Sequence, residues 1–473
     1  MPFVNRNRLV LALCLLALGL AADQILHHPA GIGWFLLALA GTAVLVLFAR
    51  PRPWSLALIG AGLALTTVAF LRASPPLIAL NLMAAGGLAM LGASFALGGE
   101  PVRTGARAYV IRGLRATGAV PDGVMTFAPR VQLSNVRGAA RLARTSALVL
   151  VVLTVFGMLL ASADPVFAQT ITAPLRIDLP FPQLMQHTVV TVLAAIAAGT
   201  LVAYARREQA ALPEGSVKMP MSLEPWEWTA VLGAVVALFA AFVLFQFPNL
   251  FGGHQTVLEE IGLTYSEYAR SGFAQMVVAT ILTLALIGFA WFAGAGSNIR
   301  FRVVAGALVA LDIVVLVSAF QRLAVYEEAF GFTHLRLFGH VLIIWLAVML
   351  VCVIVSLAVA NGRWLPFAAI ALAVVALVGL NIVNPDAFIV ERNVERAATG
   401  EHPLDARYLA SLSADAAPAL VASLDEVSPD DLARLQKQGA LTASESCYVD
   451  DDPWISFNLA RERAASAVAS YCS

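Results

Sequence analysis

Residues 341–360, VLIIWLAVMLVCVIVSLAVA, form an apolar run of twenty residues without a charged side chain. A helix rises about 1.5 Å per residue, so roughly 20 apolar residues cross the ~30 Å hydrocarbon core of a bilayer. This run belongs to a longer segment, residues 335–360, and ten similar segments occur elsewhere. They cover approximately residues 9–26, 30–49, 54–71, 76–98, 145–163, 183–204, 227–247, 271–294, 303–325 and 364–383.

The composition supports the same interpretation. The 473 residues are 60% hydrophobic and 13% charged, and the mean hydropathy is +0.81, far from the values of soluble domains. The apolar runs are continuous instead of alternating, and an open sheet edge is not tolerated in lipid. We therefore predict an all-α polytopic membrane bundle of about eleven spans.

Arginines predict the orientation of these spans, since short cytoplasmic connections accumulate Lys and Arg. The connection 99–144 holds eight arginines against only Glu100 and Asp122, which predicts that it is cytoplasmic. Alternation then places the amino terminus inside and the carboxy terminus outside. The topological signal explains this loop without a nucleic-acid partner. A cleaved signal peptide over residues 1–21 is an alternative for the first span and leaves the remaining topology unchanged.

This topology divides the chain into four parts. Residues 1–98 are expected to hold amino-terminal transmembrane helices, 99–144 an Arg-rich cytoplasmic loop, and 145–383 a central transmembrane bundle. Residues 384–473 carry 15 of the 30 acidic residues and 7 of the 30 basic ones. Their apolar spacing, broken by prolines, predicts an acidic extramembrane domain of three or four short amphipathic helices.

Two cysteines, Cys447 and Cys472, lie in this exported segment. In an oxidising compartment they can form a disulfide, which would stabilise the small domain by roughly 3 to 4 kcal/mol. The alternative is two unrelated thiols.

The connection after the ninth span, AVYEEAFGFTHLRLFGHV (residues 324–341), is predicted to be a tight hairpin at the outer face. Gly331 suits the left-handed position that ends a helix, and Thr333 can cap the next helix.

The charges of this hairpin oppose the dipoles of the two helices. Glu327 and Glu328 occupy the last turn of one helix, while His334 and Arg336 occupy the first turn of the next. Each misplacement costs about 0.3–1 kcal/mol, so we expect a carboxylate to pair with Arg336 across the turn. The cluster is extended, one turn away on each side, by Arg322 and His340.

A second stretch, TYSEYARSGF (residues 264–273), opens the eighth span at the same face. Thr264 and Glu267 fit a capping box. Arg270 has no such explanation, and we expect it to meet Glu327 or Glu328. Such a cluster is either a structural clamp or a ligand or substrate site.

The motifs YSEYAR, YEEAFGFTHLR, NPDAFIVERNVERA (384–397) and LDARYLASLSADAAPAL (404–420) resemble the polytopic bacterial membrane proteins grouped as domain of unknown function 4173. The resemblance covers roughly residues 226–420. The family pattern often shows Tyr at positions 330 and 338, which are Phe here, and a basic residue in place of Ser271. The resemblance implies a multi-pass protein of the bacterial cytoplasmic membrane without an assigned activity.

Asp312 lies near the middle of the ninth span. An acid at the bilayer midplane costs at least ~2.5 kcal/mol on insertion scales and usually faces the bundle interior. It can relay protons or bind a cation, or it can be a protonated side chain that makes one hydrogen bond to a neighbouring helix.

Known catalytic motifs are not found. The chain has no GxxxxGK[ST] phosphate loop and no HExxH helix, and His27-His28 near Asp23 lacks a spaced third ligand. We therefore expect no catalytic residue, metal or cofactor.

Three functions remain open. The first is a non-enzymatic envelope protein that senses or assembles with a protein partner through its acidic outer domain. The second is a secondary transporter or proton-coupled carrier that uses Asp312, although no inverted repeat is visible. The third is an outer-face lipid-linked transferase that uses Glu327 or Glu328. In each case the lipid bilayer is the surrounding partner.

Overall fold

The computed structural model describes residues 2–117, 119–127, 181–206, 225–251, 273–292, 295–399, 404–438 and 453–472. Every regular element in these ranges is a helix, which confirms the all-α prediction. Nine of the described helices are long and apolar enough to cross a membrane. A further helix, α11 (Pro225–Phe251), carries a shorter apolar stretch, Trp228–Leu244. The expected span at 145–163 lies outside the described residues.

The chain forms two compact units. Unit 1 comprises Met1–Asp23 and Val120–Thr200, and unit 2 comprises Gln24–Ala119 and Leu201–Ser473. Unit 1 contains most of α1 (Pro2–Leu26) and α10 (Phe181–Arg206), together with α7 (Val120–Met125). The first two helices approach closely at Gly19, where a Cβ would overlap the carbonyl oxygen of Thr191. Small residues permit such close packing between membrane helices.

The amino-terminal part of unit 2 departs from the expected spans in one respect. The run at 54–71 is divided at Thr67 into two helices, because the hydroxyls of Thr66 and Thr67 each donate to the carbonyl three residues earlier, at 2.7 Å. Within the region expected to be an Arg-rich loop, residues 101–103 and 106–117 are helical. The elements are α2 (Ile32–Ala49), α3 (Pro53–Thr66), α4 (Val68–Leu71), α5 (Pro75–Ser94), η1 (Pro101–Arg103) and α6 (Ala106–Thr117).

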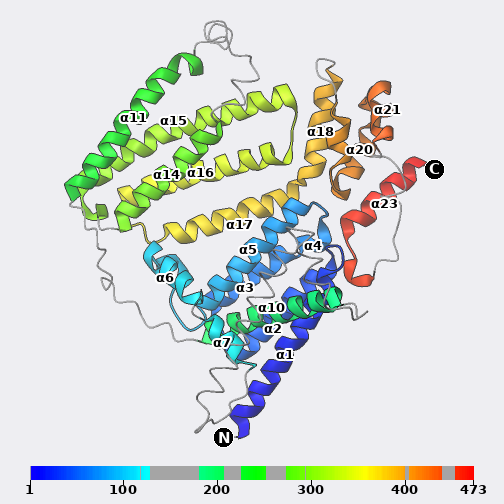
Figure 1. Cartoon of the computed structure of the whole chain (residues 1–473). Coiled ribbons are helices and arrows are strands. Elements are labelled where there is room, and N and C mark those ends of the chain that lie inside the picture. Colours follow the sequence, from blue (N-terminus) through cyan, green and yellow to red (C-terminus); the bar gives the residue numbers. More distant parts are fainter. Residues whose placement is uncertain are drawn as a thin grey trace, which may run out of the picture. The chain divides into compact units, whose positions relative to one another are not determined.

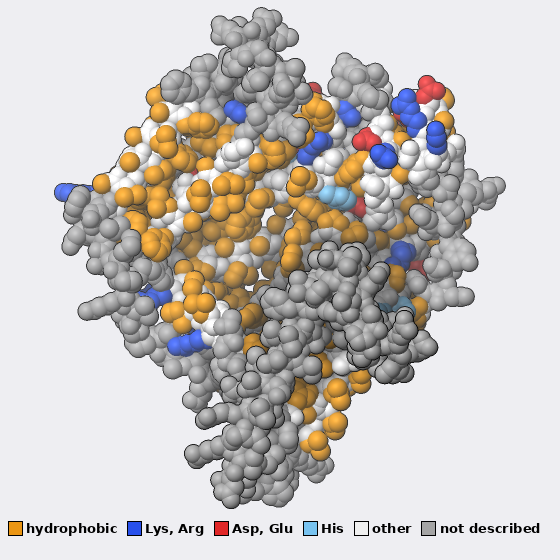
Figure 2. Space-filling model, viewed as in Figure 1, with side chains coloured by type: hydrophobic (Ala, Val, Ile, Leu, Met, Phe, Trp, Pro, Cys, Tyr) orange, Lys and Arg blue, Asp and Glu red, His pale blue; other side chains and the backbone are white. Residues whose placement is uncertain are grey.

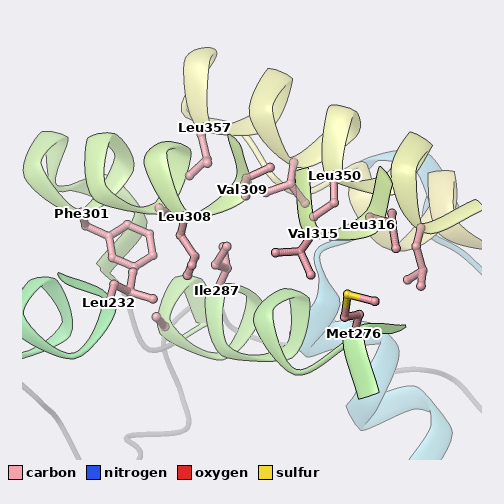
Figure 3. Packing of buried hydrophobic residues seen from close by; sticks show 14 of the residues in the cluster. Leu232, Met276, Ile287, Phe301, Leu308, Val309, Val315, Leu316, Leu350 and Leu357 are labelled. Carbon is pink, nitrogen blue, oxygen red and sulfur yellow. The ribbon is translucent and has the colours of Figure 1, made fainter. Parts of the chain in front are cut away.

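Four described helices of unit 2 share one apolar core. They are α11, α14 (Phe273–Phe292), α15 (Ile299–Phe330) and α16 (His334–Ala358), with a short 3-10 turn at Ala295–Ser297 before α15. Figure 3 shows how Phe301 and Leu308 of α15 point toward the neighbouring helices. Helix α17 (Leu365–Val383) contacts both α16 and α5 and so joins this core to the amino-terminal helices (Figure 1).

The bundle presents apolar side chains on its outside. Leu238, Leu282 and Ile382 are 67%, 63% and 74% exposed, and apolar side chains dominate the described surface in Figure 2. A soluble monomer rarely exposes so continuous an apolar surface. The spans therefore face lipid.

Helix α15 is longer than the bilayer requires. Its 32 residues extend over about 48 Å, compared with a hydrocarbon core of ~30 Å. The helix begins before and ends after the expected span 303–325, so its last turns, including Glu327 and Glu328, project beyond the apolar stretch.

Every described regular element of the carboxy-terminal segment is a helix, as predicted, and the segment packs on the α15–α16 hairpin. Its core includes Ile389, Leu409 and Leu420, and the hairpin residues Phe332 and Leu337 pack against that core. In the described residues the segment contains α18 (Pro385–Ala398), α19 (Ala406–Ala410), η3 (Ala414–Ala416), α20 (Ala417–Ala422), η4 (Leu424–Glu426), α21 (Pro429–Lys437), η5 (Trp454–Ser456) and α23 (Leu459–Cys472).

The connections of unit 2 gather at two ends of its helices. At one end, the 72–74 connection and the α15–α16 hairpin both contact the carboxy-terminal segment. At the other end, the Arg52 amide donates to the Ala96 carbonyl, and the Arg302 guanidinium donates to the Leu357 carbonyl. This grouping is the one that the predicted alternation of spans requires within unit 2.

Candidate functional site

The α15–α16 turn is held from two directions. Gly331 has φ +80°, which favours glycine, and its amide closes α15 on the carbonyl of Glu327 at 2.7 Å. The side-chain amide of Asn393 accepts from the Phe332 amide at 2.8 Å and donates to its carbonyl at 2.9 Å. Thr333 occupies the predicted cap position without a side-chain cap bond. The carboxy-terminal segment thus fixes the conformation of this turn.

Asp386 is the centre of the polar cluster at this end. Its buried carboxylate accepts from the His334 ring at Oδ1 and from the Ser74 hydroxyl, also at Oδ1, at 3.2 Å. Oδ2 accepts from the Ser413 amide at 2.9 Å and from the Ser413 hydroxyl. Four donors from three separate segments therefore converge on one carboxylate.

Tyr408 extends this cluster on the other side of the histidine. Its hydroxyl accepts from the His334 amide at 2.9 Å and lies 3.4 Å from His334 Nδ1. It thereby takes the capping role that Thr333 does not fill. Burial is the main reason why the pKa of Tyr408 is raised, and the nearby Asp386 charge adds to the effect.

A second carboxylate, Asp415, binds the connection between α4 and α5. It accepts from the amides of Ala73 and Ser74, the latter at 3.1 Å, and lies 3.5 Å from the guanidinium of Arg72. Arg72 also donates to the carbonyl of Asn381 at 2.6 and 2.9 Å. The carboxy-terminal segment, the α4–α5 connection and the end of α17 are joined in this way.

The two carboxylates have opposite pKa shifts. For Asp386, burial raises the pKa, but the hydrogen bonds from His334 and Ser413 outweigh it, so the pKa lies below its ordinary value. For Asp415, burial raises the pKa, and the Ala73 amide and Arg72 only partly offset it. Asp386 is accordingly held in its charged form.

Glu327 forms a separate pair inside the end of the bundle. It is 4% exposed, and its Oε1 lies 3.2 Å from Nδ1 of His340. The His340 ring also contacts Phe320 edge-on, with the ring centroids 4.5 Å apart. Glu327 and His340, two members of the predicted cluster, are therefore in contact with each other, although this particular pair was not predicted.

The prediction that a carboxylate pairs with Arg336 is wrong within the described part of the chain. The guanidinium donates to the carbonyls of Phe330 and Gly331 and lies over the Tyr326 ring, with Cζ 4.2 Å from its centroid. A cation on the last carbonyls of α15 offsets the negative helix end, which replaces the expected ion pair. The backbone carbonyl of Glu328 accepts from Arg396 at 3.5 Å.

Several residues of the predicted sites lie outside the part of the chain that the structure describes. Glu267 and Arg270 fall in the range 252–272, so their meeting with Glu327 or Glu328 stays a prediction. Cys447 is also outside it, and the disulfide with Cys472 likewise stays a prediction. Arg322 lines a cavity beside α11 and α14 and has an interaction partner.

Asp312 is fully buried within the bundle, as predicted. Its Oδ1 accepts from the Thr280 hydroxyl of α14 at 2.9 Å. Its Oδ2 has no hydrogen-bond partner among the described residues. Asn81 of α5 and Asn381 of α17 form a reciprocal amide pair at 2.8 and 2.9 Å, which is an interhelical hydrogen bond.

Sequence reasoning missed the most connected members of the cluster. Asp386, Asp415 and Tyr408 all lie in the motifs NPDAF and LDARYLASLSADAAPAL, and nothing in their spacing points to His334. In unit 1, His187 Nδ1 lies 2.8 Å from Asp23 Oδ2, a pairing that the sequence also did not suggest.

Asp386 with its three partners His334, Ser74 and Ser413 joins separate segments of the chain by hydrogen bonds, and we call this group the Asp386 clamp. A carboxylate that already accepts four hydrogen bonds would have to lose donors before it could ligate a cation or act as a base. The side chain of His334 is 22% exposed and is the member of the Asp386–His334 pair that solvent reaches.

Comparison with known proteins identifies a family. The model of a domain of unknown function (DUF4153) matches residues 9–423. No curated protein and no solved structure matches the chain. The resemblance to domain of unknown function 4173 is not confirmed, since the matching family model is a different one.

Proposed function

The chain belongs to the DUF4153 family, and from this premise we propose that it is a non-enzymatic protein of the bacterial cytoplasmic membrane that senses or assembles with an envelope partner. In this proposal residues 384–473 face outward and bind the partner. Binding of the partner would act on the helix bundle through the hydrogen bonds that His334 and Ser74 donate to Asp386. The family assignment itself names no activity.

The observation that carries the proposal is the convergence on Asp386. Ser413 of the carboxy-terminal segment, His334 of α16 and Ser74 before α5 share one buried carboxylate. Asp386 and Ser413 both belong to the segment, so a partner that pulls it away must break the bonds that His334 and Ser74 donate to Asp386 at the ends of two membrane helices. Such a connection suits a receiver or assembly element, because a displacement of the segment acts directly on the bundle.

The segment also has the charge needed for a selective partner. It carries 15 acidic and 7 basic residues, and its exposed α21 begins with Pro429-Asp430-Asp431. We expect the partner to present a basic surface, since complementary charge increases the association rate and selectivity.

Orientation is supported by arginines of the short connections, with Arg72 and Arg336 as the exceptions at the clamp end. Arg52, Arg302 and Arg363 lie at the end of unit 2 opposite the clamp, where the positive-inside rule expects the cytoplasm. A cysteine introduced at exposed Glu391 should react with a membrane-impermeant maleimide in intact spheroplasts, and one at exposed Arg103 should not. The reverse labelling would reject the proposal.

Partner binding can be tested with a photo-crosslinking residue at Asp430 in the full-length protein. A covalent product should form in cells and should weaken when Asp430, Asp431 and the neighbouring acids become Asn or Gln. The matched control is the same probe at Leu238, which faces outward from α11. Crosslinks that form only at the control position would count against the proposal. So would a protein lacking residues 404–473 that still corrects every phenotype of a strain from which the gene has been deleted.

A second function is supported by Asp312. A buried carboxylate with one oxygen unpartnered among the described residues is suited to gain a proton or a cation during transport. We propose a proton-coupled carrier as the alternative. In proteoliposomes, Asp312→Asn should abolish proton flux, while the exposed Glu100→Gln should not. Unchanged flux in Asp312→Asn would reject the carrier.

The outer-face transferase receives less support. Glu327 is buried and paired with His340, so it is poorly placed to meet a substrate at the surface. Glu327→Gln should therefore change stability more than any turnover.

A further inference from the structure

An apolar cleft lies at the Arg-rich end of unit 2, far along the helices from the clamp. It has a volume of about 490 Å³ and is formed by α14, α16 and α17 together with Gly105 and the first residues of α6. Its walls are apolar, with Trp291 and Trp345 as the largest side chains. The size is in the range of cavities that bind small molecules or single lipid chains.

The cleft is elongated along the helix axes. From Trp291 to Leu284 on α14, and from Val353 to Trp345 on α16, it follows the helices for on the order of 10–12 Å. Both helices end at the Arg-rich side, so the cleft runs from that membrane boundary toward the bilayer interior. A long apolar ligand would lie parallel to the helices.

Charge is concentrated at one end of this cleft. Arg107 and Arg363 line it next to Gly105 and Gly362, and each also has another interaction partner. Arg363 is exposed and Arg107 is half-buried. Two guanidiniums above an apolar channel complement a ligand with an anionic head and an apolar tail.

The surroundings favour a membrane lipid over a soluble ligand. The walls belong to helices α14, α16 and α17, each long and apolar enough to span the bilayer. Tryptophans are typical of the interface where head groups begin, and basic pockets between membrane helices bind anionic head groups. Trp291 precedes the last residue of α14 and so lies at this boundary. Trp345 lies near the middle of α16, at the inner end of the cleft, where its indole N–H donates to the Ala369 carbonyl at 3.3 Å.

We infer that this cleft is a specific site for an anionic phospholipid, with one acyl chain between α14, α16 and α17 and the phosphate at Arg107 and Arg363. The inference does not depend on the proposed function, because the clamp and the cleft share no residue. The lipid would fix the relative positions of three spans at this boundary.

The test uses the full-length protein purified in mild detergent. Phosphatidylglycerol and phosphatidylcholine with identical acyl chains are titrated separately, and native mass spectrometry counts the bound lipids. Phosphatidylglycerol should bind about 10- to 30-fold more tightly at one site. Equal affinity for the two lipids would overturn the inference.

Two sets of variants separate the head group from the chain. Gly288 lines the cleft, and a Cβ added there meets no heavy atom within 4 Å, so Gly288→Leu should fill the cleft without a clash and remove the site. Gly306→Leu on α15 is the matched control, since its Cβ is equally free and Gly306 does not line the cleft. Retained high-affinity binding in Gly288→Leu would overturn the inference.

Arg107→Gln combined with Arg363→Gln should reduce phosphatidylglycerol to the affinity of phosphatidylcholine. Arg103→Gln, on an exposed side chain outside the cleft, should leave the preference intact. This pair keeps the inference testable if Gly288→Leu does not fold. A preference that survives the double variant, or that inorganic phosphate alone removes, would contradict the lipid assignment.

Discussion

Substitution of Asp386 tests whether its hydrogen bonds hold the carboxy-terminal segment on the helix bundle. The Asp386→Asn substitution keeps the shape of the side chain but replaces one oxygen by a donor. Oδ1 can still accept from His334 and Ser74, whereas the new NH₂ faces the amide and hydroxyl of Ser413. The hydroxyl can rotate to accept, but the Ser413 amide is left without an acceptor.

The cost follows from these contacts. The Ser413 amide is half-buried, so the loss of its acceptor costs at most the ~1–3 kcal/mol of a fully buried donor, and the loss of the negative charge weakens the remaining bonds by about 1 kcal/mol. The docked carboxy-terminal segment should therefore be destabilised by up to about 4 kcal/mol. At 1.4 kcal/mol per factor of ten, its opening should increase by up to about 700-fold.

Hydrogen–deuterium exchange of the full-length protein in detergent measures this opening. Peptides from α18 (Pro385–Ala398) should exchange faster in Asp386→Asn, while peptides from the centre of α16 should not change. Glu391→Gln is the control, because Glu391 is exposed on the same helix and its loss should change stability by less than about 0.5 kcal/mol. Equal exchange in wild type and Asp386→Asn would refute the reasoning.

Three further predictions follow from the same contacts. Gly331→Ala places a Cβ against Asn393 Oδ1 at φ +80° and should destabilise the hairpin by about 1–3 kcal/mol in thermal unfolding, whereas Gly306→Ala should be neutral or stabilising. A double-mutant cycle of Asn81→Val and Asn381→Val should give a coupling of about 0.6–2 kcal/mol, and additive effects would show that the amide pair contributes nothing. Because the pKa of Asp386 is lowered in the docked state, its stabilisation is fully present above the unfolded pKa of about 3.9 and is lost as the pH falls through the docked pKa. The difference in exchange between wild type and Asp386→Asn should thus still be present at pH 5 and shrink below about pH 4; a difference that disappears by pH 5 would contradict this assignment.

The spans were predictable because each depends on a local property. A run such as 335–360 must be helical in lipid whatever surrounds it, since its backbone groups have no other partners. The structure places α16 at His334–Ala358, in agreement with that run. The break at Thr67 was not predictable from hydropathy, because hydroxyl-to-carbonyl bonds decide it and leave the apolar count unchanged.

The candidate site was predictable only in part. The unfavourable charges of the 324–341 hairpin correctly marked a place where other groups must compensate. The sequence could not identify the compensating groups. The guanidinium of Arg336 can donate hydrogen bonds either to the last carbonyls of a helix or to a carboxylate, and the spacing of the residues does not distinguish the two. Asp386 lies 52 positions from His334 in sequence, and only the docking of α18 brings the two together.

The amino-acid sequence by itself determined the membrane class, the positions of the long helices and the acidic character of residues 384–473, because hydropathy, helix rise and charge are sums over neighbouring residues. The tertiary structure alone decided which polar side chains meet. Hydrogen bonds act over about 3 Å between groups whose separation depends on the packing of the whole bundle. For that reason His334 binds Asp386, and Arg336 binds the end of α15.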